Sequence, residues 1–211
     1  MTGRPVFARG PFTVPSFRFQ WPADLLTSWA GEMEGIILGW YIIVETGSVV
    51  LLTFYSSLQF VGTLFSPLFG VICDRIGARN LLCLMCAAYF VFAATFMSLA
   101  FTGLLNATYA LIVAGAMGLV RSSDLVMRNQ LIGASMPPAL LVGAASVTRT
   151  TQDSARIAGS LAGAGMFAAL GMGLSYVVIA TLYALSAGLT LGAYREARSQ
   201  APRDRGQDGS E

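Results

Sequence analysis

Two glutamates interrupt a long apolar stretch of this 211-residue chain, where a carboxyl group can do chemistry. Glu32 and Glu34 lie within an apolar block of about residues 23–44. A carboxylate in a poorly hydrated cavity is suited to loading and unloading a proton, so we expect one of the two to line a proton pathway. Two residues apart on a helix, they point about 200° from each other and cannot both face one cavity. The alternative is a hydrogen-bonded carboxyl that locks helix packing.

Two further sets of charges recur at helical spacing in later apolar blocks. Each set places two arginines and one aspartate on a single helix face, so they can pair along the helix. The sets are Arg121, Asp124 and Arg128, and Arg149, Asp153 and Arg156. The set at residues 149–156 leaves one surplus positive charge for an anion or for a carboxylate elsewhere. We expect Asp124, Arg149, Asp153 and Arg156 to line the proton or substrate pathway.

The elements that hold these charges are expected to be membrane helices. Hydrophobic residues make up 55% of the chain and charged residues 11%, with a mean hydropathy of +0.65. Soluble domains carry roughly 25% charged residues, and about 20 apolar residues span a bilayer. The sequence therefore predicts an all-α membrane protein with six transmembrane helices. The apolar blocks cover about residues 23–44, 48–72, 80–102, 105–132, 139–169 and 173–194.

The distribution of arginine predicts the orientation of these helices. The connections at 45–47, 103–104 and 170–172 contain no arginine, whereas the opposite loops and both ends do. Since basic residues concentrate on the cytoplasmic side, we expect both termini inside the cell. The sequence therefore predicts three parts of the chain: a cytoplasmic, partly disordered arm at 1–21, a six-helix transmembrane domain at 22–194, and a disordered cytoplasmic tail at 195–211. Four aromatic residues, Phe12, Phe17, Phe19 and Trp21, are expected to anchor this region in the headgroup zone.

Composition argues against several other classes of protein. The chain has no histidine, which excludes histidine-based catalysis and histidine-ligated metal. Its net charge of +2 argues against a nucleic-acid partner, because such proteins usually carry a clustered basic face. Cys83 and Cys86 form a CxxC, but a zinc site needs two more ligands, so we interpret them as small apolar residues. Neither a cofactor motif nor the signature of an enzyme is present. We expect no cofactor, no metal, no nucleic-acid partner and no enzymatic activity.

The loop after the second apolar block carries a recognisable motif. Its sequence is GVICDRIGAR, and it resembles the GxxxDRxGRR loop signature of the major facilitator superfamily. Ala78 departs from the pattern, because the family usually has a basic residue there. The matching residues are Gly70, Asp74, Arg75, Gly77 and Arg79. By that resemblance, Asp74 would form a gate latch with Arg121 or Arg128; alternatively, both arginines extend to the cytoplasmic interface.

Two later stretches resemble the drug and siderophore exporter branch of that superfamily. Residues 136–146 are similar to its VPxxxLxxAxS pattern, and residues 158–163 to its GPxxGG element. Gly159 and Gly163 match, whereas Ser160 replaces the proline. Small residues at this spacing let two helices approach closely, so we expect these glycines to serve helix packing.

Members of the superfamily have two six-helix halves with the substrate site between them. This chain has the length of one half, and its loop signature resembles that of the amino-terminal one. The resemblance implies a half-size secondary transporter in the bacterial cytoplasmic membrane, working by alternating access. A second copy or a separate six-helix half would complete the pathway. Proton-coupled export of a small organic molecule is the implied activity; the alternative is a non-transporting accessory or assembly subunit of another membrane complex.

Overall fold

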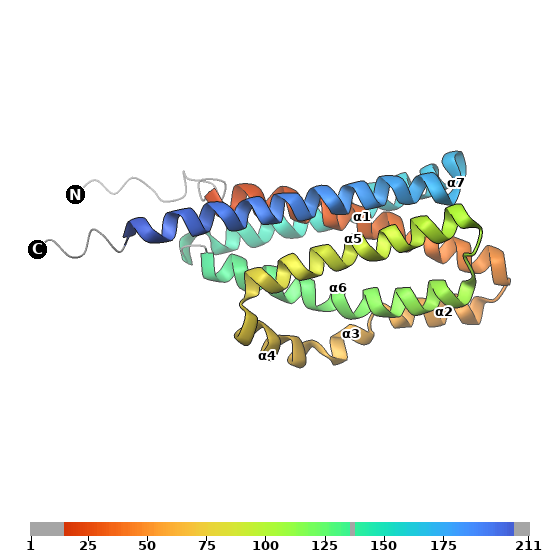
Figure 1. Cartoon of the computed structure of the whole chain (residues 1–211), viewed down its shortest axis with the longest axis horizontal. Helices are drawn as coiled ribbons and strands as arrows, with labels where there is room; N and C mark the ends of the chain where they lie inside the picture. Colours follow the sequence, from red (N-terminus) through yellow and green to blue (C-terminus); the bar gives the residue numbers. More distant parts are fainter. Residues whose placement is uncertain (1–14, 136–137, 205–211) are drawn as a thin grey trace, which may run out of the picture.

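The structure is a computed structural model and describes residues 15–135 and 138–204. Within those ranges the chain is helical and contains no strand, which confirms the all-α prediction for this part of the chain (Figure 1). The six-span topology in a membrane stays a prediction. The helices are α1 Pro15–Thr46, α2 Val49–Leu58, α3 Val61–Leu64, α4 Ser66–Ile76, α5 Ala78–Thr102, α6 Ala107–Ser135 and α7 Pro138–Asp204.

Glycines with positive φ angles occupy four chain reversals. Gly47, Gly77 and Gly103 separate helices, and Gly171 (φ 72°, ψ −177°) divides α7 into two segments, residues 138–170 and 172–204. Positive φ costs a residue with a Cβ atom energy that glycine does not incur, so glycine is favoured at these tight turns. The reversals lie within the short connections and the motif loop described above.

The second apolar block is not one helix but three. Between α2 and α4 the chain turns at Gln59 and Phe60, forms the four-residue α3, and turns again at Phe65. Backbone contact explains the position of the break, because a Cβ atom at Gly62 would collide with the Gly118 carbonyl of α6. Interrupted helices at membrane depth are tolerated where they are buried in protein or line a cavity.

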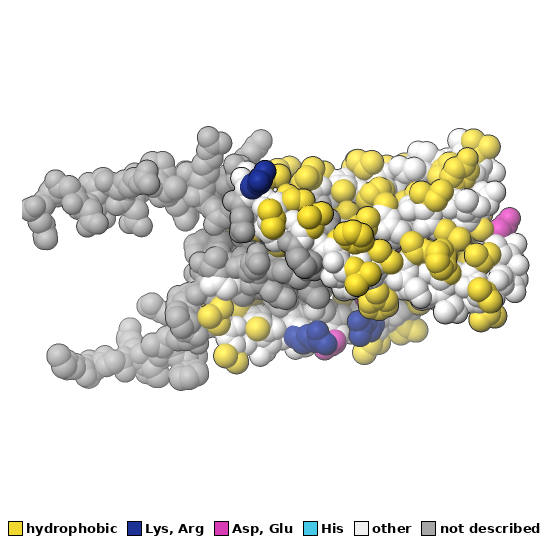
Figure 2. All heavy atoms as spheres, turned by 90° about the horizontal axis from the view of Figure 1, so that it is seen from below, with side chains coloured by type: hydrophobic (Ala, Val, Ile, Leu, Met, Phe, Trp, Pro, Cys, Tyr) yellow, Lys and Arg dark blue, Asp and Glu magenta, His cyan; other side chains and the backbone are white. Residues whose placement is uncertain are grey.

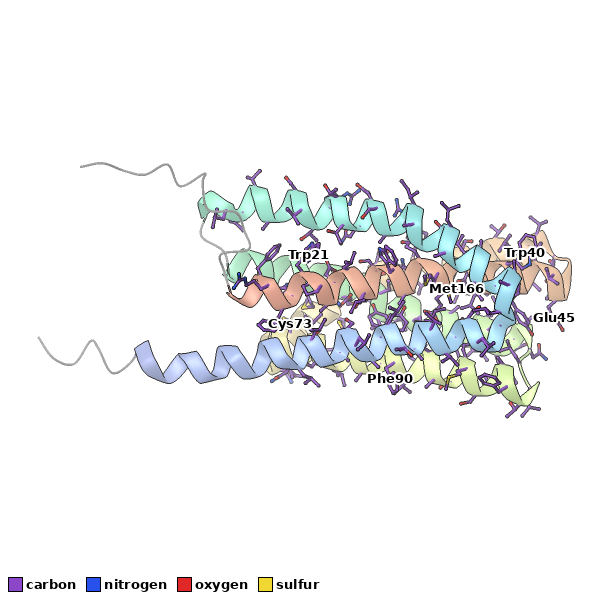
Figure 3. All side chains as sticks on the ribbon, turned by 90° about the horizontal axis from the view of Figure 1, so that it is seen from above. Trp21, Trp40, Glu45, Cys73, Phe90 and Met166 are labelled. Carbon is purple, nitrogen blue, oxygen red and sulfur yellow. The ribbon has the colours of Figure 1, made fainter. Side chains whose placement is uncertain are left out.

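Helix α1 lies between the two segments of α7 (Figure 3). Gly163 of the first segment packs so closely that a Cβ atom there would lie 2.8 Å from Met33 Cα. On the other side, Thr27 and Ser186 of the second segment share a hydrogen bond of 2.6 Å between their hydroxyl oxygens. The main core lies between α1, α5, α6 and the second segment of α7. Its fully buried members include Ile37, Phe96, Ala110, Tyr176 and Ile179.

The outer surface is largely apolar. Figure 2 shows one face on which hydrophobic side chains are widespread and charged side chains are few. Two described stretches, Asn80–Thr102 and Leu140–Gly192, are long and apolar enough to cross a membrane, and Val49–Leu64 is a shorter apolar stretch. Exposed apolar side chains are stable where lipid or another protein covers them. These features indicate an integral membrane protein.

The ends of the helical region extend beyond the predicted domain boundaries. Helix α1 begins at Pro15, so residues 15–21 of the expected arm are its first turns. Phe17 is buried against Ala144, and the Trp21 indole N–H donates a 3.0 Å hydrogen bond to Thr151 Oγ1. This packing on α7 accounts for the earlier start. Helix α7 continues to Asp204, into the expected tail; both helix ends lie at the same end of the bundle (Figure 1).

Candidate functional site

An ion pair joins α1 to α6 near the middle of α1. Arg121 Nη2 lies 2.9 Å from Glu32 Oε1, and Arg121 Nη1 donates a 3.2 Å hydrogen bond to the Gly31 carbonyl. The guanidinium can lie across α1 here because Gly31 has no side chain; a Cβ atom would meet Arg121 Nη1 at 3.4 Å. The pair is partly open, with 41% of the Arg121 side chain exposed.

Two open cavities meet at this ion pair. One, which we call the proximal cavity, measures about 440 Å³ and is lined by α1 residues from Asp24 to Glu32. The other, the distal cavity, measures about 530 Å³ and is lined by α1 residues from Gly31 to Ile43. A third, small cavity of about 30 Å³ lies behind the pair. Three residues line all three cavities and form what we call the junction: Gly31, Gln59 and Arg121.

A second charge cluster joins the same two helices inside the bundle. Arg128 Nε lies 2.9 Å from Asp124 Oδ2 and 3.5 Å from Asp24 Oδ1. Arg128 Nη2 also donates to Thr27 Oγ1 at 3.3 Å and contacts Cys86 Sγ at 3.9 Å. Only 3% of the Arg128 side chain is exposed. Two carboxylates against one guanidinium leave this cluster formally negative.

Glu34 faces the bundle interior, away from Glu32. Its side chain lines the small cavity, whereas Glu32 lines the two open ones. The Tyr183 hydroxyl donates a 3.0 Å hydrogen bond to Glu34 Oε2. The buried Tyr176 hydroxyl also interacts with the Glu34 carboxyl group, at a geometry short of a full hydrogen bond. The two glutamates therefore sit in different environments although they are two residues apart.

The charges of α7 do not form one unit. Arg149 Nε and Asp153 Oδ2 are 3.7 Å apart along the helix, and both side chains are mostly exposed. Neither residue lines the proximal or distal cavity. Arg156 does line the proximal cavity, together with Gln152 one turn earlier, and has no ion-pair partner in the described part of the chain.

The motif loop spans the end of α4 and the start of α5. Gly77 has a φ angle of 87° and its N–H donates to the Cys73 carbonyl, so it ends α4. Gly70 lies within α4 with open space around it, and Arg75 is exposed. The side chains of Asp74 and Arg79 lie outside the described residues, so the gate latch stays a prediction. Both proposed latch arginines bind other carboxylates in this conformation.

The expected packing glycines lie against α1. A Cβ atom at Gly159 would lie 3.1 Å from Glu32 Cβ, and one at Gly163 would be closer still to Met33. These contacts place the first segment of α7 beside the proximal cavity. The position of Glu32 therefore depends on the small residues of α7 as well as on Arg121.

Several residues of the site were missing from the sequence prediction, among them Asp24, Gln59 and Tyr183. Asp24 could have been found, because Asp24, Thr27 and Gly31 recur at helical spacing and form a polar stripe on α1. Gln59 and Tyr183 carry no such signal. Their importance comes from the break between α2 and α3 and from the packing of α7 on α1.

This arrangement combines proton acceptors with hydrogen-bonding groups in an apolar bundle. The proximal cavity contains carboxylates, guanidinium groups, amides and hydroxyls, which suits a small polar molecule. Both residues of the Glu32–Arg121 pair line the proximal and the distal cavity, so the pair lies where the two cavities meet. Ionisable residues within membrane helices mark ion or substrate pathways.

In the comparisons with known proteins, one family model matches part of the chain. Residues 40–132 match the family model described as LacY proton/sugar symporter, a family of the major facilitator superfamily. No curated protein and no solved structure matches the chain. The matched stretch includes the motif loop, Arg121 and Arg128, whereas Glu32 and Glu34 precede it. This part of the chain is therefore similar to proton-coupled sugar transporters of the major facilitator superfamily.

Proposed function

We propose that this protein is half of a proton-coupled secondary transporter of the major facilitator type. The observation that carries the proposal is the Glu32–Arg121 ion pair at the junction of two open cavities in an apolar helical bundle. The family match over residues 40–132 supports the same class. Alternating access would require this pair and its counterpart in the other half to rearrange as solute passes.

A second copy of the chain, or a separate six-helix half, would cover the open cavities. In a lone half, Arg121, Arg149 and Asp153 would be exposed in the apolar part of the bilayer, which is costly. A covering half would enclose these charges between two sets of helices. A homodimer is the simplest such assembly, because closed twofold dimers are the commonest oligomers. The native mass of the gently extracted complex tests this part of the proposal.

The lining of the proximal cavity supports a small, polar organic solute. Arg156 and Gln152 face it from α7, and Gln59 and Thr63 from the broken second block. Such groups bind hydroxyl and carboxylate oxygens, and the matched family is named for sugar transport. For the direction we propose export, on the resemblance of residues 136–146 and 158–163 to the exporter branch.

The test uses the purified full chain in liposomes with an imposed proton gradient. A panel of labelled sugars, organic acids and amphiphilic drugs is offered in each orientation of the gradient. We expect one class to accumulate, and we expect Glu32→Gln to abolish that accumulation. Glu45→Gln is the matched control, because Glu45 is exposed at the end of α1 and lines neither the proximal nor the distal cavity. Gradient-driven accumulation that is unchanged in Glu32→Gln would remove Glu32 from the mechanism; no gradient-driven movement of any class would overturn the proposal.

A further inference from the structure

Glu34 is a buried carboxyl group with one hydrogen-bond donor. Its residue is 4% exposed, and its Oε2 atom accepts the Tyr183 hydroxyl proton at 3.0 Å. Its carboxyl group also interacts with the buried Tyr176 hydroxyl, at a geometry short of a full hydrogen bond. An ionised carboxylate is costly in such surroundings unless it is paired and fully hydrogen-bonded. Glu34 therefore has a physical reason to bind a proton.

Tyr183 connects this carboxyl group to the open side of the site. Its side chain lines both the small cavity with Glu34 and the proximal cavity. Tyr89 stacks on it with a ring-centroid distance of 5.3 Å and holds the ring in place. The small cavity, of about 30 Å³, has room for roughly one or two water molecules beside Glu34.

The charged and titratable groups around Glu34 come from α2, α5, α6 and α7, and in the described part of the chain they include one cation. Arg121 is that cation, and its guanidinium is already bound to Glu32. The other titratable neighbours are tyrosines, which are neutral at physiological pH. Loss or gain of a proton at Glu34 therefore changes the charge that faces Arg121. These tyrosines are Tyr55 from α2, Tyr89 from α5, and Tyr176 and Tyr183 from α7.

We infer that Glu34 binds the coupling proton and that the Tyr183 hydroxyl delivers it from the proximal cavity. In this step the O–H proton of Tyr183 passes to Glu34 Oε2. At the same time a hydronium ion in the proximal cavity gives a proton to the Tyr183 oxygen and becomes water. The hydroxyl group is restored, and the net change is one proton moved from the cavity to the carboxylate. The inference rests on the proposed proton coupling and assigns its binding residue.

Infrared difference spectroscopy between acid and alkaline buffer tests this without a transported solute. The sample is the full chain in liposomes of phosphatidylethanolamine and phosphatidylglycerol, and isotope labelling of the glutamate carboxyls identifies their C=O band. We expect the band of a buried protonated carboxyl to be lost in Glu34→Gln and kept in Glu32→Gln. In Tyr183→Phe we expect the band to change frequency and to appear about tenfold more slowly after a pH jump.

Tyr55→Phe is the matched control, because Tyr55 lines the small cavity with Glu34, does not line the proximal cavity, and donates its hydroxyl proton to the Gly35 carbonyl. A buried-carboxyl band that survives in Glu34→Gln would overturn the assignment of the proton site. Equal rates in Tyr183→Phe and Tyr55→Phe would overturn delivery through Tyr183. The isotope-labelled wild type and the tyrosine pair keep the test decisive if Glu34→Gln does not fold. An intact, titrating band in a protein that moves no solute would contradict the proposed function alone.

Discussion

Two charge clusters join α1 to α6, and they differ in exposure more than in composition. Glu32–Arg121 lies at the junction of two open cavities, and 41% of the Arg121 side chain is exposed. About two turns further along α6, Arg128 binds Asp24 and Asp124 and is 3% exposed. A partly hydrated pair can break and form at little cost, whereas a buried one cannot. We therefore expect the Glu32–Arg121 pair to rearrange during function, and the Arg128 cluster to hold α1 against α6.

The largest expected effect is on the buried cluster. Arg128→Ala leaves Asp24 and Asp124 without their cation, and we expect it to lower the free energy of unfolding by about 3–5 kcal/mol. Denaturant or thermal unfolding in detergent micelles measures this change. The control is Arg149→Ala, which removes a mostly exposed pair and is expected to cost about 1 kcal/mol or less.

A neutral replacement of the whole cluster sharpens the same prediction. Arg128→Met combined with Asp24→Asn and Asp124→Asn removes all three charges, so no buried charge remains unpaired. We expect this variant to recover much of the stability lost in Arg128→Ala. Equal instability of the two variants would show that the shape of the cluster, rather than its charge balance, holds α1 to α6.

The next largest effect concerns the backbone contact beside the open pair. Gly118 lies three residues before Arg121, and a Cβ atom there would collide with the Leu58 carbonyl of α2. We expect Gly118→Ala to cost about 1–3 kcal/mol through overpacking. It should also reduce transport, because moving the broken second block displaces Gln59 at the junction. Unfolding and uptake in liposomes are measured together.

Gly70→Ala is the matched control for this substitution. Gly70 lies in α4, and a Cβ atom added to it would have no neighbouring atom within 4 Å, so alanine there meets open space. Alanine is the better helix former by about 0.5–1 kcal/mol, so the control is expected to be neutral or slightly stabilising. A loss of stability at Gly70 equal to that at Gly118 would contradict the close backbone contact as the cause.

The sequence predicts the helices well and the pairing between helices poorly. Apolar block lengths and glycines such as Gly47 and Gly171 locate the turns, because both signals are local. The break at Gln59 is harder to predict: the stretch Val49–Leu64 is apolar on average, and the interruption coincides with close backbone contact between Gly118 and Leu58 of another helix. In the same way, the spacing of Arg121 and Arg128 predicts one shared helix face. It cannot show that one arginine binds Glu32 in an open cavity and the other is buried.

The smallest effect on stability is expected at Arg121. A substitution there is the most direct test of the difference between the two charge clusters. Arg121→Gln keeps a hydrogen-bonding side chain beside Glu32 and the Gly31 carbonyl, and breaks only a partly hydrated ion pair. We expect the free energy of unfolding to fall by about 1 kcal/mol or less. Gradient-driven transport should nevertheless be lost, because the charge between the proximal and distal cavities is gone. If Arg121→Gln is instead as unstable as Arg128→Ala, both clusters attach helices and neither is free to move. If it is stable and still transports, the route of the solute does not pass the junction.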